Sequence, residues 1–392
     1  MATAIRKVSS ALGKVAAANS LLTPKCTLKA QTADMISKAL RDHDYKRPPP
    51  FDYKNSTYGV TAALFDKTTW RFDENSKIIV VDGPVASGKS KVAQHIASEF
   101  DMLYIPQVNM DRVYVNSYGF DMRTLNHRLP KKVQSFEPKD FHLNPKDNRA
   151  TNMEMELFRI RLGQYLDALT HLLCTGQGVV MNRSVFSDFV FVETNLDAGI
   201  LPPTLRKLYN MTWDCIRPDL MRPHLVVYLD TPVDIVRKNL AKRNTPGEVN
   251  SPVHTTEVLK MFEDIYKQKF LKTISSHAEL LVYDWSSEVD LEILVEDIER
   301  LNLDDYTQHD PKMADWRLVD EWAWCGRRMD YTKNRRNLEI WAENIPYYDC
   351  PEILVSGQER LDWLKVFEAS PGNKWAAGYN SEMGDANVMF KI

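Results

Sequence analysis

A short glycine-rich segment limits the possible folds of this chain more than any other feature of its sequence. It reads Gly-Pro-Val-Ala-Ser-Gly-Lys-Ser, from Gly83 to Ser90, and meets the spacing G-x-x-x-x-G-K-S/T. The apolar residues Ile78 to Val81 predict a buried strand before it, and apolar residues at helical spacing follow from about Lys89 to Phe100. A strand that leads through such a loop into a helix is the setting of a phosphate-binding P-loop, so we expect an α/β nucleotide-binding fold.

Each residue type in this loop has a physical role in phosphate binding. The glycine-rich turn and the N-terminus of the following helix direct backbone N–H groups at phosphate oxygens. A lysine brings positive charge to the outer phosphates, and the hydroxyl of Ser90 offers a ligand to Mg²⁺. The loop does not identify a reaction, because GTPases, ATPases, sulfotransferases and small-molecule kinases share it. The predicted phosphate-binding residues of the loop are Gly83, Ser87, Gly88, Lys89 and Ser90.

Further apolar segments predict more strands of the same sheet. Stretches with helical spacing separate them, and the longest runs from about Asn152 to Cys174. Prolines interrupt Asn109 to Arg149, where we expect an irregular insertion with short helical pieces. Strands that alternate with helices predict a three-layer fold with a five-stranded parallel sheet over residues 75–300, and a ligand at the carboxyl ends of the strands. The further predicted strands are Met102–Ile105, Val179–Met181, Leu225–Leu229 and Leu280–Tyr283.

Charge and hydropathy argue against two classes of direct partner, nucleic acid and the membrane. The formal net charge of −3 gives no general basic field, so we expect no nucleic-acid partner. No apolar run approaches the roughly 18 residues of a membrane-spanning helix, so we expect membrane association only through partners. The five cysteines are scattered without C-x-x-C spacing, which argues against a zinc site and against a disulfide framework.

The N-terminal segment has an unusual composition. Residues 1–33 contain no Asp or Glu, carry several Lys and Arg residues, and place Val8, Leu12 and Val15 on one face of a possible helix. An amphipathic, basic leader without acids is typical of a mitochondrial transit peptide, and the alternative is a basic tail. We therefore expect a transit peptide over residues 1–33 and a mitochondrial protein. The proline-rich Arg47 to Phe51 marks residues 34–74 as a linker or N-terminal extension.

The C-terminal part of the chain is rich in tryptophan. Residues 301–392 hold six of the nine tryptophans of the chain. These rings could pack back onto the core, or they could contact a partner, since aromatic residues are enriched in protein interfaces. We expect residues 301–392 to be an extension that docks on a partner. The tryptophans are Trp316, Trp322, Trp324, Trp341, Trp363 and Trp375.

Two segments carry a resemblance to a known family. GVVMNRSVFSDFVFVETNLDAG, from Gly178, and HLVVYLDTPVDIVRKNLAKR, from His224, resemble the deoxyribonucleoside kinases. The resemblance implies a deoxynucleoside-kinase-like fold, a nucleotide of the ATP or dNTP type with Mg²⁺, and a phosphate contact from Arg183. It also implies a basic lid over the phosphates, formed by Arg237, Lys238, Lys242 and Arg243, of which we expect Arg237 and Arg243 to bind phosphate.

Other segments resemble one branch of that superfamily, the kinase-like accessory subunits of mitochondrial complex I, the NADH:ubiquinone oxidoreductase. They are the leader, QYLDALTHLLCTGQGVV, EVLKMFEDIYKQKFL and PGNKWAAGYNSEMGD. This resemblance implies that the partners are other complex I subunits on the matrix side of the inner membrane. FAD is associated with these subunits, but the sequence has no flavin fingerprint, because its loop is a P-loop and not a G-x-G-x-x-G turn.

Three positions indicate that the chain has lost kinase activity. Where the kinases carry a carboxylate that accepts the hydroxyl proton, this sequence has Gln107, and an amide is no general base. Asn182 replaces the acid before Arg-Ser, and Glu154 falls near the base-reading glutamine of the family. We therefore expect a non-catalytic accessory subunit that keeps a phosphate site. The alternatives are an active mitochondrial deoxynucleoside kinase, with Asp111 or Glu193 as a substitute acid, and a nucleotide sensor.

Overall fold

The computed structural model describes residues 35–41, 46–287, 289–304, 306–307, 309–386 and 388. The predicted transit peptide, residues 1–33, lies outside the described residues. These described residues form one compact unit. Among the residues described, no helix combines the length and the apolar character needed to cross a membrane. The boundary near residue 300 stays a prediction.

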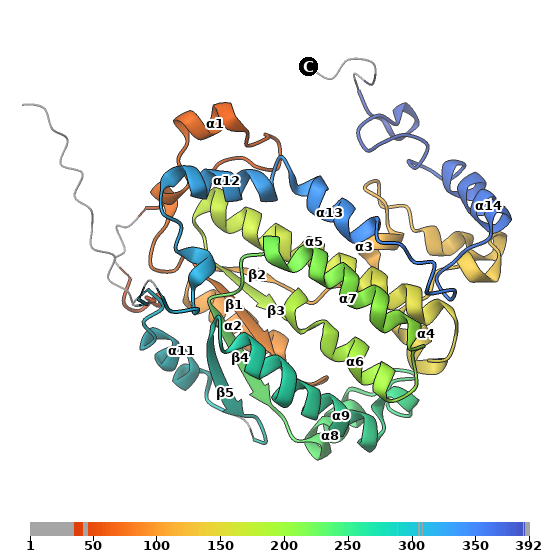
Figure 1. Ribbon diagram of the computed structural model, residues 1–392, viewed down its shortest axis with the longest axis horizontal. Helices are drawn as coiled ribbons and strands as arrows, with labels where there is room; N and C mark the ends of the chain where they lie inside the picture. The colour runs from red at the N-terminus through yellow and green to blue at the C-terminus, as the bar shows by residue number, and fades with distance from the viewer. Residues whose placement is uncertain are drawn as a thin grey trace, which may run out of the picture. The chain divides into compact units, whose positions relative to one another are not determined.

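The core of this unit is a parallel sheet of five strands in the order β2-β3-β1-β4-β5 (Figure 1). The first strand of the chain lies at its centre, where Ile79 is in register with Val180 on β3 and with Leu225 on β4. All five predicted strands are present, which confirms the predicted fold class. Their bounds are β1 Ile78–Asp82, β2 Leu103–Ile105, β3 Val179–Asn182, β4 Leu225–Asp230 and β5 Glu279–Asp284.

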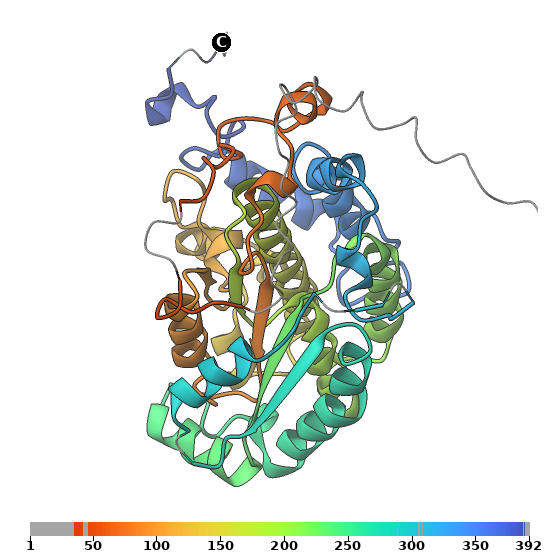
Figure 2. The same ribbon diagram turned by 90° about the vertical axis from the view of Figure 1, so that its left-hand side faces the viewer.

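Helices cover both faces of the sheet, and the two faces are built by alternate residues of the strands. On β1, Ile78 and Val80 pack with the apolar residues of α5 (Arg149–Thr175), while Ile79 and Val81 pack with α2 (Lys89–Glu99) and α11 (Leu291–Glu299). A strand that is buried on both faces has a continuous run of apolar residues in its sequence, and β1 has such a run from Ile78 to Val81. Figure 2 shows the sheet from the side between these layers.

The remaining helices between β2 and β5 separate successive strands in the sequence. The predicted irregular insertion is confirmed as a series of short helices, α3 (Asp111–Tyr114), η2 (Met122–Arg128), η3 (Lys131–Val133) and α4 (Pro138–Leu143). The other helices between β3 and β5 are η4 Val185–Ser187, α6 Phe189–Asp197, α7 Thr204–Ile216, η5 Arg217–Asp219, α8 Val233–Arg243, η6 Pro252–His254, α9 Thr256–Ile265, the π-helical turn η7 Tyr266–Phe270 and α10 Leu271–Ile274.

The first of the three C-terminal α-helices packs against the segment that precedes the sheet. The three are α12 (Glu321–Tyr331), α13 (Arg335–Glu343) and α14 (Gly357–Glu368), and Figure 1 shows α12 beside α1 (Val60–Phe65). The fully buried Arg328 of α12 reaches Asp66, with 3.0 Å between Nη2 and Oδ2, and its guanidinium lies 3.6 Å from the ring centre of Tyr58. Residues that are far apart in the sequence therefore share one buried ion pair.

The tryptophans of this C-terminal part have two different surroundings. Trp316 and Trp324 pack against the main core, and the Trp316 indole donates a hydrogen bond to the carbonyl of Arg222. The side chains of Trp322 and Trp341 are each 57% exposed. Part of the region packs back onto the core, and part presents aromatic rings outward.

Candidate phosphate-binding site

The P-loop follows the carboxyl end of the central strand. Its two glycines have backbone conformations or close contacts that disfavour a residue with a side chain. Gly83 has φ of 147°, and a Cβ at this position would lie 2.8 Å from the carbonyl oxygen of Leu229. Gly88 has φ of 82°, in the left-handed region that glycine adopts without strain. These conformations bring the chain from β1 into α2, as the motif predicts.

The motif lysine is buried within its own loop. The Nζ of Lys89 donates to the carbonyl oxygen of Pro84 at 2.5 Å and to the hydroxyl of Ser87 at 3.2 Å. Burial, and then the charge of Arg183, hold the pKa of the Lys89 ammonium well below its usual range. A phosphate anion in contact with Nζ would stabilise the charged ammonium form, so the environment of this lysine suits an anionic ligand.

Arg183 joins the P-loop to the end of the third strand. Its backbone has φ of 73°, and its Nη2 donates to the carbonyl oxygen of Gly83 at 2.8 Å. Its Nε lies 3.7 Å from the carboxylate of Asp82, which accepts a hydrogen bond of 2.7 Å from the hydroxyl of Tyr266. The guanidinium also stacks over Phe191, 4.2 Å from the ring centre. These contacts fix a positive charge beside the P-loop.

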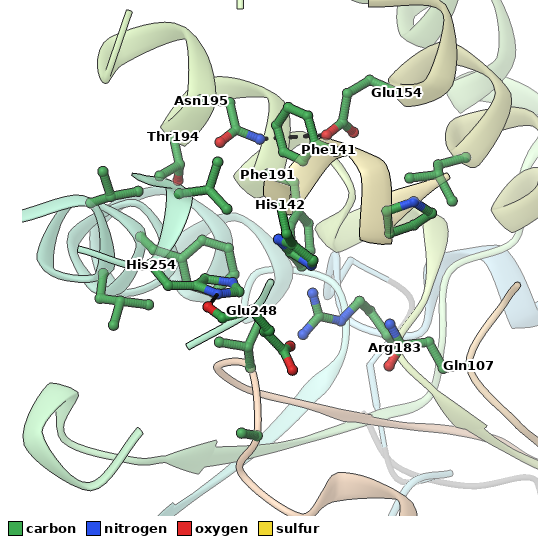
Figure 3. A pocket seen from close by; sticks show the side chains of 18 of the residues that line it. Gln107, Phe141, His142, Glu154, Arg183, Phe191, Thr194, Asn195, Glu248 and His254 are labelled. Atoms are coloured by element: carbon green, nitrogen blue, oxygen red, sulfur yellow. Dashed lines mark hydrogen bonds between the residues drawn. The ribbon is translucent and has the colours of Figure 1, made fainter. Parts of the chain in front are cut away.

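A cavity of about 220 Å³ opens next to these cations (Figure 3). Three of the predicted phosphate-binding side chains, Lys89, Arg183 and Arg243, line it together. Arg237 does not line it, and instead donates an exposed hydrogen bond of 3.0 Å to the hydroxyl of Thr256. The structure therefore brings one of the two lid arginines to the cavity.

The far side of the cavity holds a buried charged network. The carboxylate of Glu154 accepts a hydrogen bond of 3.4 Å from the Asn195 amide, and Arg161 forms an ion pair with Asp188. Burial raises the pKa of Glu154 to about 7, although the charge of Arg161 opposes the shift. At neutral pH this side chain therefore exists in both forms, and its protonated form can donate a hydrogen bond to a ligand.

The acids proposed as substitutes for the missing catalytic base point elsewhere. Gln107 lines the cavity, but Asp111 and Glu193 do not. Asp111 forms an ion pair with Arg123 at 2.7 Å, and Glu193 pairs with surface cations on α7 and η7. The carboxylates among the described lining residues are Glu154 and Glu248.

Glu248 belongs to a group of lining residues that the sequence did not indicate. It pairs with Arg243, whose Nε lies 3.0 Å from Oε2, and it lies close to His142 and His254. His142 is on α4 and the other two residues follow α8, so no short spacing in the sequence connects all three. The spacing of Glu248 and His254 alone is a signal too weak to find such a group.

The Mg²⁺ implied by the kinase resemblance has a limited ligand set here. Asn182 donates from its amide to the hydroxyl oxygen of Ser90. Its buried carbonyl Oδ1 has no hydrogen-bond partner among the described residues. Ser90 and this neutral oxygen could contact a magnesium ion, but with less charge attraction than a carboxylate gives.

Comparisons with known proteins agree with the α/β fold class. The family model for deoxynucleoside kinase matches residues 79–317. Two mammalian relatives are similar over most of the chain, and both are NADH dehydrogenase (ubiquinone) 1 alpha subcomplex subunit 10, mitochondrial. The Mus musculus protein is 35% identical over 85% of this chain and 90% of its own length. The Bos taurus protein is 33% identical over 85% of this chain and 93% of its own length.

More distant similarity extends to enzymes and to a solved structure. Deoxyguanosine kinase of Dictyostelium discoideum is 24% identical over 60% of this chain and 73% of its own length. A solved deoxyadenosine kinase of M. mycoides with bound dATP is 18% identical, with a TM-score of 0.41, over 56% of this chain and 96% of that chain.

Proposed function

This chain belongs to the deoxynucleoside kinase family, in the branch of the mitochondrial complex I alpha-subcomplex subunits, and we propose that it is a non-catalytic accessory subunit of that complex. The observation that carries the proposal is the chemistry of the cavity. Cations that suit phosphate line the cavity together with Gln107, which the resemblance to the kinases places where they carry the catalytic carboxylate. A general base typically contributes about 10²- to 10⁴-fold to a rate, so its loss leaves a binding site without efficient phosphoryl transfer.

The proposed ligand of the site is a nucleotide of the ATP or dNTP type. The glycine turn, Lys89 and Arg183 would hold its phosphates, and Arg243 would close over them from α8. Mg²⁺ would contact Ser90 and contribute charge neutralisation. We assign no flavin to this site, because its phosphate contacts are those of a P-loop.

The proposed partners are other complex I subunits, on the matrix side of the inner mitochondrial membrane. The mitochondrial relatives and the predicted transit peptide support the location. The outward-facing rings support docking: Trp322 on α12 and Trp70 are more than half exposed, and Phe65 on α1 is 82% exposed. The backbone N–H groups of Thr68 and Thr69 bond to the Glu321 carboxylate, so the segment that carries Trp70 contacts the start of α12.

The alternative is an active mitochondrial deoxynucleoside kinase, favoured by the intact P-loop. Two measurements on the same protein separate the functions: phosphoryl transfer from ATP to each deoxynucleoside, and migration of the endogenous protein on blue-native gels. We expect no turnover and comigration with the very large complex I band. Turnover that is abolished in Lys89→Ala, together with migration as a small free species, would overturn the proposal.

A nucleotide sensor shares the same site but differs in its consequence for assembly. If occupancy of the P-loop changes assembly, Lys89→Ala should reduce the amount of the protein in the complex I band. If the subunit is structural, the variant should assemble normally as long as it remains folded. Gel migration of the Lys89→Ala protein beside a Lys91→Ala control decides between them, because Lys91 is exposed on the same helix.

A further inference from the structure

Three side chains with metal-ligating atoms converge on the phosphate cavity from separate elements. His142 lies near the end of α4, Glu248 follows α8, and His254 ends η6. One donor atom of each lies within 4.8 Å of the others, and Figure 3 shows the two rings and the carboxylate close together on the cavity wall. We propose that His142, Glu248 and His254 bind a zinc ion.

The hydrogen bond of His254 prepares its ring for a metal. Its Nδ1 lies 3.0 Å from the backbone carbonyl oxygen of Glu248. A carbonyl can only accept, so Nδ1 carries the proton and Nε2 keeps its lone pair. Metal-bound histidines almost always donate their other ring nitrogen in this way, which fixes both the tautomer and the direction of the ring.

His142 has a buried ring nitrogen without a use in the rest of the fold. Its Nδ1 makes no hydrogen bond to any residue that the structure describes. Its ring centre lies 4.8 Å from that of His254, at an interplanar angle of 39°. The two rings come from separate elements, α4 and η6, and approach each other on the cavity wall.

Glu248 completes a donor set that suits zinc. The carboxylate is buried and bonded to Arg243, but each oxygen keeps a further lone pair, so one can face the ion while Arg243 remains bound. Two imidazoles and a carboxylate form a known zinc ligand set, with the fourth tetrahedral position open to water or substrate. Since all three residues line the cavity, this position is accessible to a ligand in it.

The ion would join the lid segment to α4. The two parts already touch, because the hydroxyl of Ser251 donates to the carbonyl oxygen of His142 at 2.8 Å. Gly247 also lies against Leu143, since a Cβ at this glycine would be 2.8 Å from the Cδ2 atom of the leucine. A zinc ion bridging these segments would hold the lid, including Arg243, in one position over the phosphates. The site itself does not depend on nucleotide binding.

The test is a zinc titration of the purified full-length protein after removal of metal by EDTA. Zinc chloride is added in competition with a chromophoric chelator, and bound metal is counted by mass spectrometry. We expect one equivalent of tightly bound zinc. His142→Gln and His254→Gln should each weaken binding by more than about 100-fold, beyond the usual cost of losing an outer partner of a metal ligand. His127→Gln, which removes an exposed imidazole elsewhere, is the matched control and should bind as the parent protein.

Thermal unfolding supplies a second readout. Zinc should raise the Tm of the parent protein and of His127→Gln, but not that of the His142→Gln, His254→Gln double variant. If that variant does not fold by circular dichroism, Glu248→Gln, which preserves side-chain volume, decides through its own loss of affinity. Absence of tight binding to the parent protein, or equal affinity in parent and folded variants, would overturn the proposal.

Discussion

The amide of Asn182 donates a hydrogen bond to the hydroxyl of Ser90, with 2.7 Å between Nδ2 and Oγ. The P-loop serine is therefore held by a neutral group at the position where the kinases carry an acid. An amide can orient the serine but cannot add the negative charge that attracts a magnesium ion. This contact connects the retained phosphate loop with the reduced metal site.

The first prediction concerns Asn182→Asp. The new carboxylate would lie beside Ser90 and attract Mg²⁺, so magnesium should increase nucleotide affinity at least about tenfold more than in the parent protein, which corresponds to about 1.4 kcal/mol. A fluorescent ATP analogue, titrated with Mg²⁺ and with EDTA, measures this difference. Asn109→Asp adds the same charge at an exposed position and should leave the magnesium effect unchanged. Equal responses in the two variants would contradict the role given to Asn182.

The second prediction separates binding from stability at Lys89. Lys89→Met should lower nucleotide affinity by about 1.5–3 kcal/mol, the usual contribution of a hydrogen bond to a charged group. Because burial holds the pKa of Lys89 low, its charged form is disfavoured in the ligand-free fold, and the same variant should raise the ligand-free Tm. Calorimetry and thermal unfolding measure the two effects. Lys91→Met should change neither, and a ligand-free Tm below that of the parent protein would show that Lys89 instead supports the fold.

The third prediction is a pH dependence of stability from Glu154. Its folded pKa of about 7 lies above the ordinary value of 4.5, so the folded state holds the proton more tightly than the unfolded state. This contribution is present in full below pH 4.5 and decreases as the pH rises to about 7. Glu154→Gln removes it, and should gain stability relative to the parent protein by up to about 3 kcal/mol across that window.

Urea unfolding at several pH values tests the prediction for Glu154. The half-buried Glu156, on the same helix, provides the control, and Glu156→Gln should show no comparable gain with pH. The opposite result is that the free energies of unfolding of Glu154→Gln and of the parent protein differ by the same amount from pH 5 to pH 8. That result would rule out Glu154 as the source of the pH dependence.

The fourth prediction concerns the buried pair of Arg328 and Asp66. Arg328→Met removes one of the two arginines that pair with Asp66, since Arg71 keeps its own contact at 2.6 Å, and it removes the stacking on Tyr58. We therefore expect a loss of about 1.5–3 kcal/mol in the free energy of unfolding. Arg336→Met removes an arginine with an exposed side chain on α13, and should cost about 0.5 kcal/mol or less. Denaturant unfolding followed by tryptophan fluorescence measures both. Similar losses in the two variants would mean that the buried pair contributes little.

The central fold could be predicted because its signals are local. Each strand of the sheet is a short apolar run, and both glycine positions of the P-loop follow from the motif. The central strands β1, β3 and β4 are buried on both faces, so hydropathy alone locates them without any knowledge of their neighbours. The third strand and the Asn-Arg-Ser sequence at its end could likewise be interpreted from a few neighbouring residues.

The groups that could not be predicted join residues far apart in the sequence. Arg328 meets Asp66, and His142 meets His254, only because packing brings their helices together. The same limit affected the substitute acids: nothing in the local sequence of Asp111 or Glu193 showed that each pairs with a surface cation. Such contacts depend on the register and angle of packed elements, which hydropathy does not determine.

The central position of β1 also determines when the chain can fold during its synthesis. Both edges of this first strand need partners that come much later, since Val81 pairs with Asn182 on one side and with Val227 on the other. Until those residues have left the ribosome, an apolar strand and the loop after it remain without their neighbours. Such long-range pairing is slow and exposes the intermediate to aggregation. The same strand that presents the phosphate loop therefore takes its place only after the later strands are available.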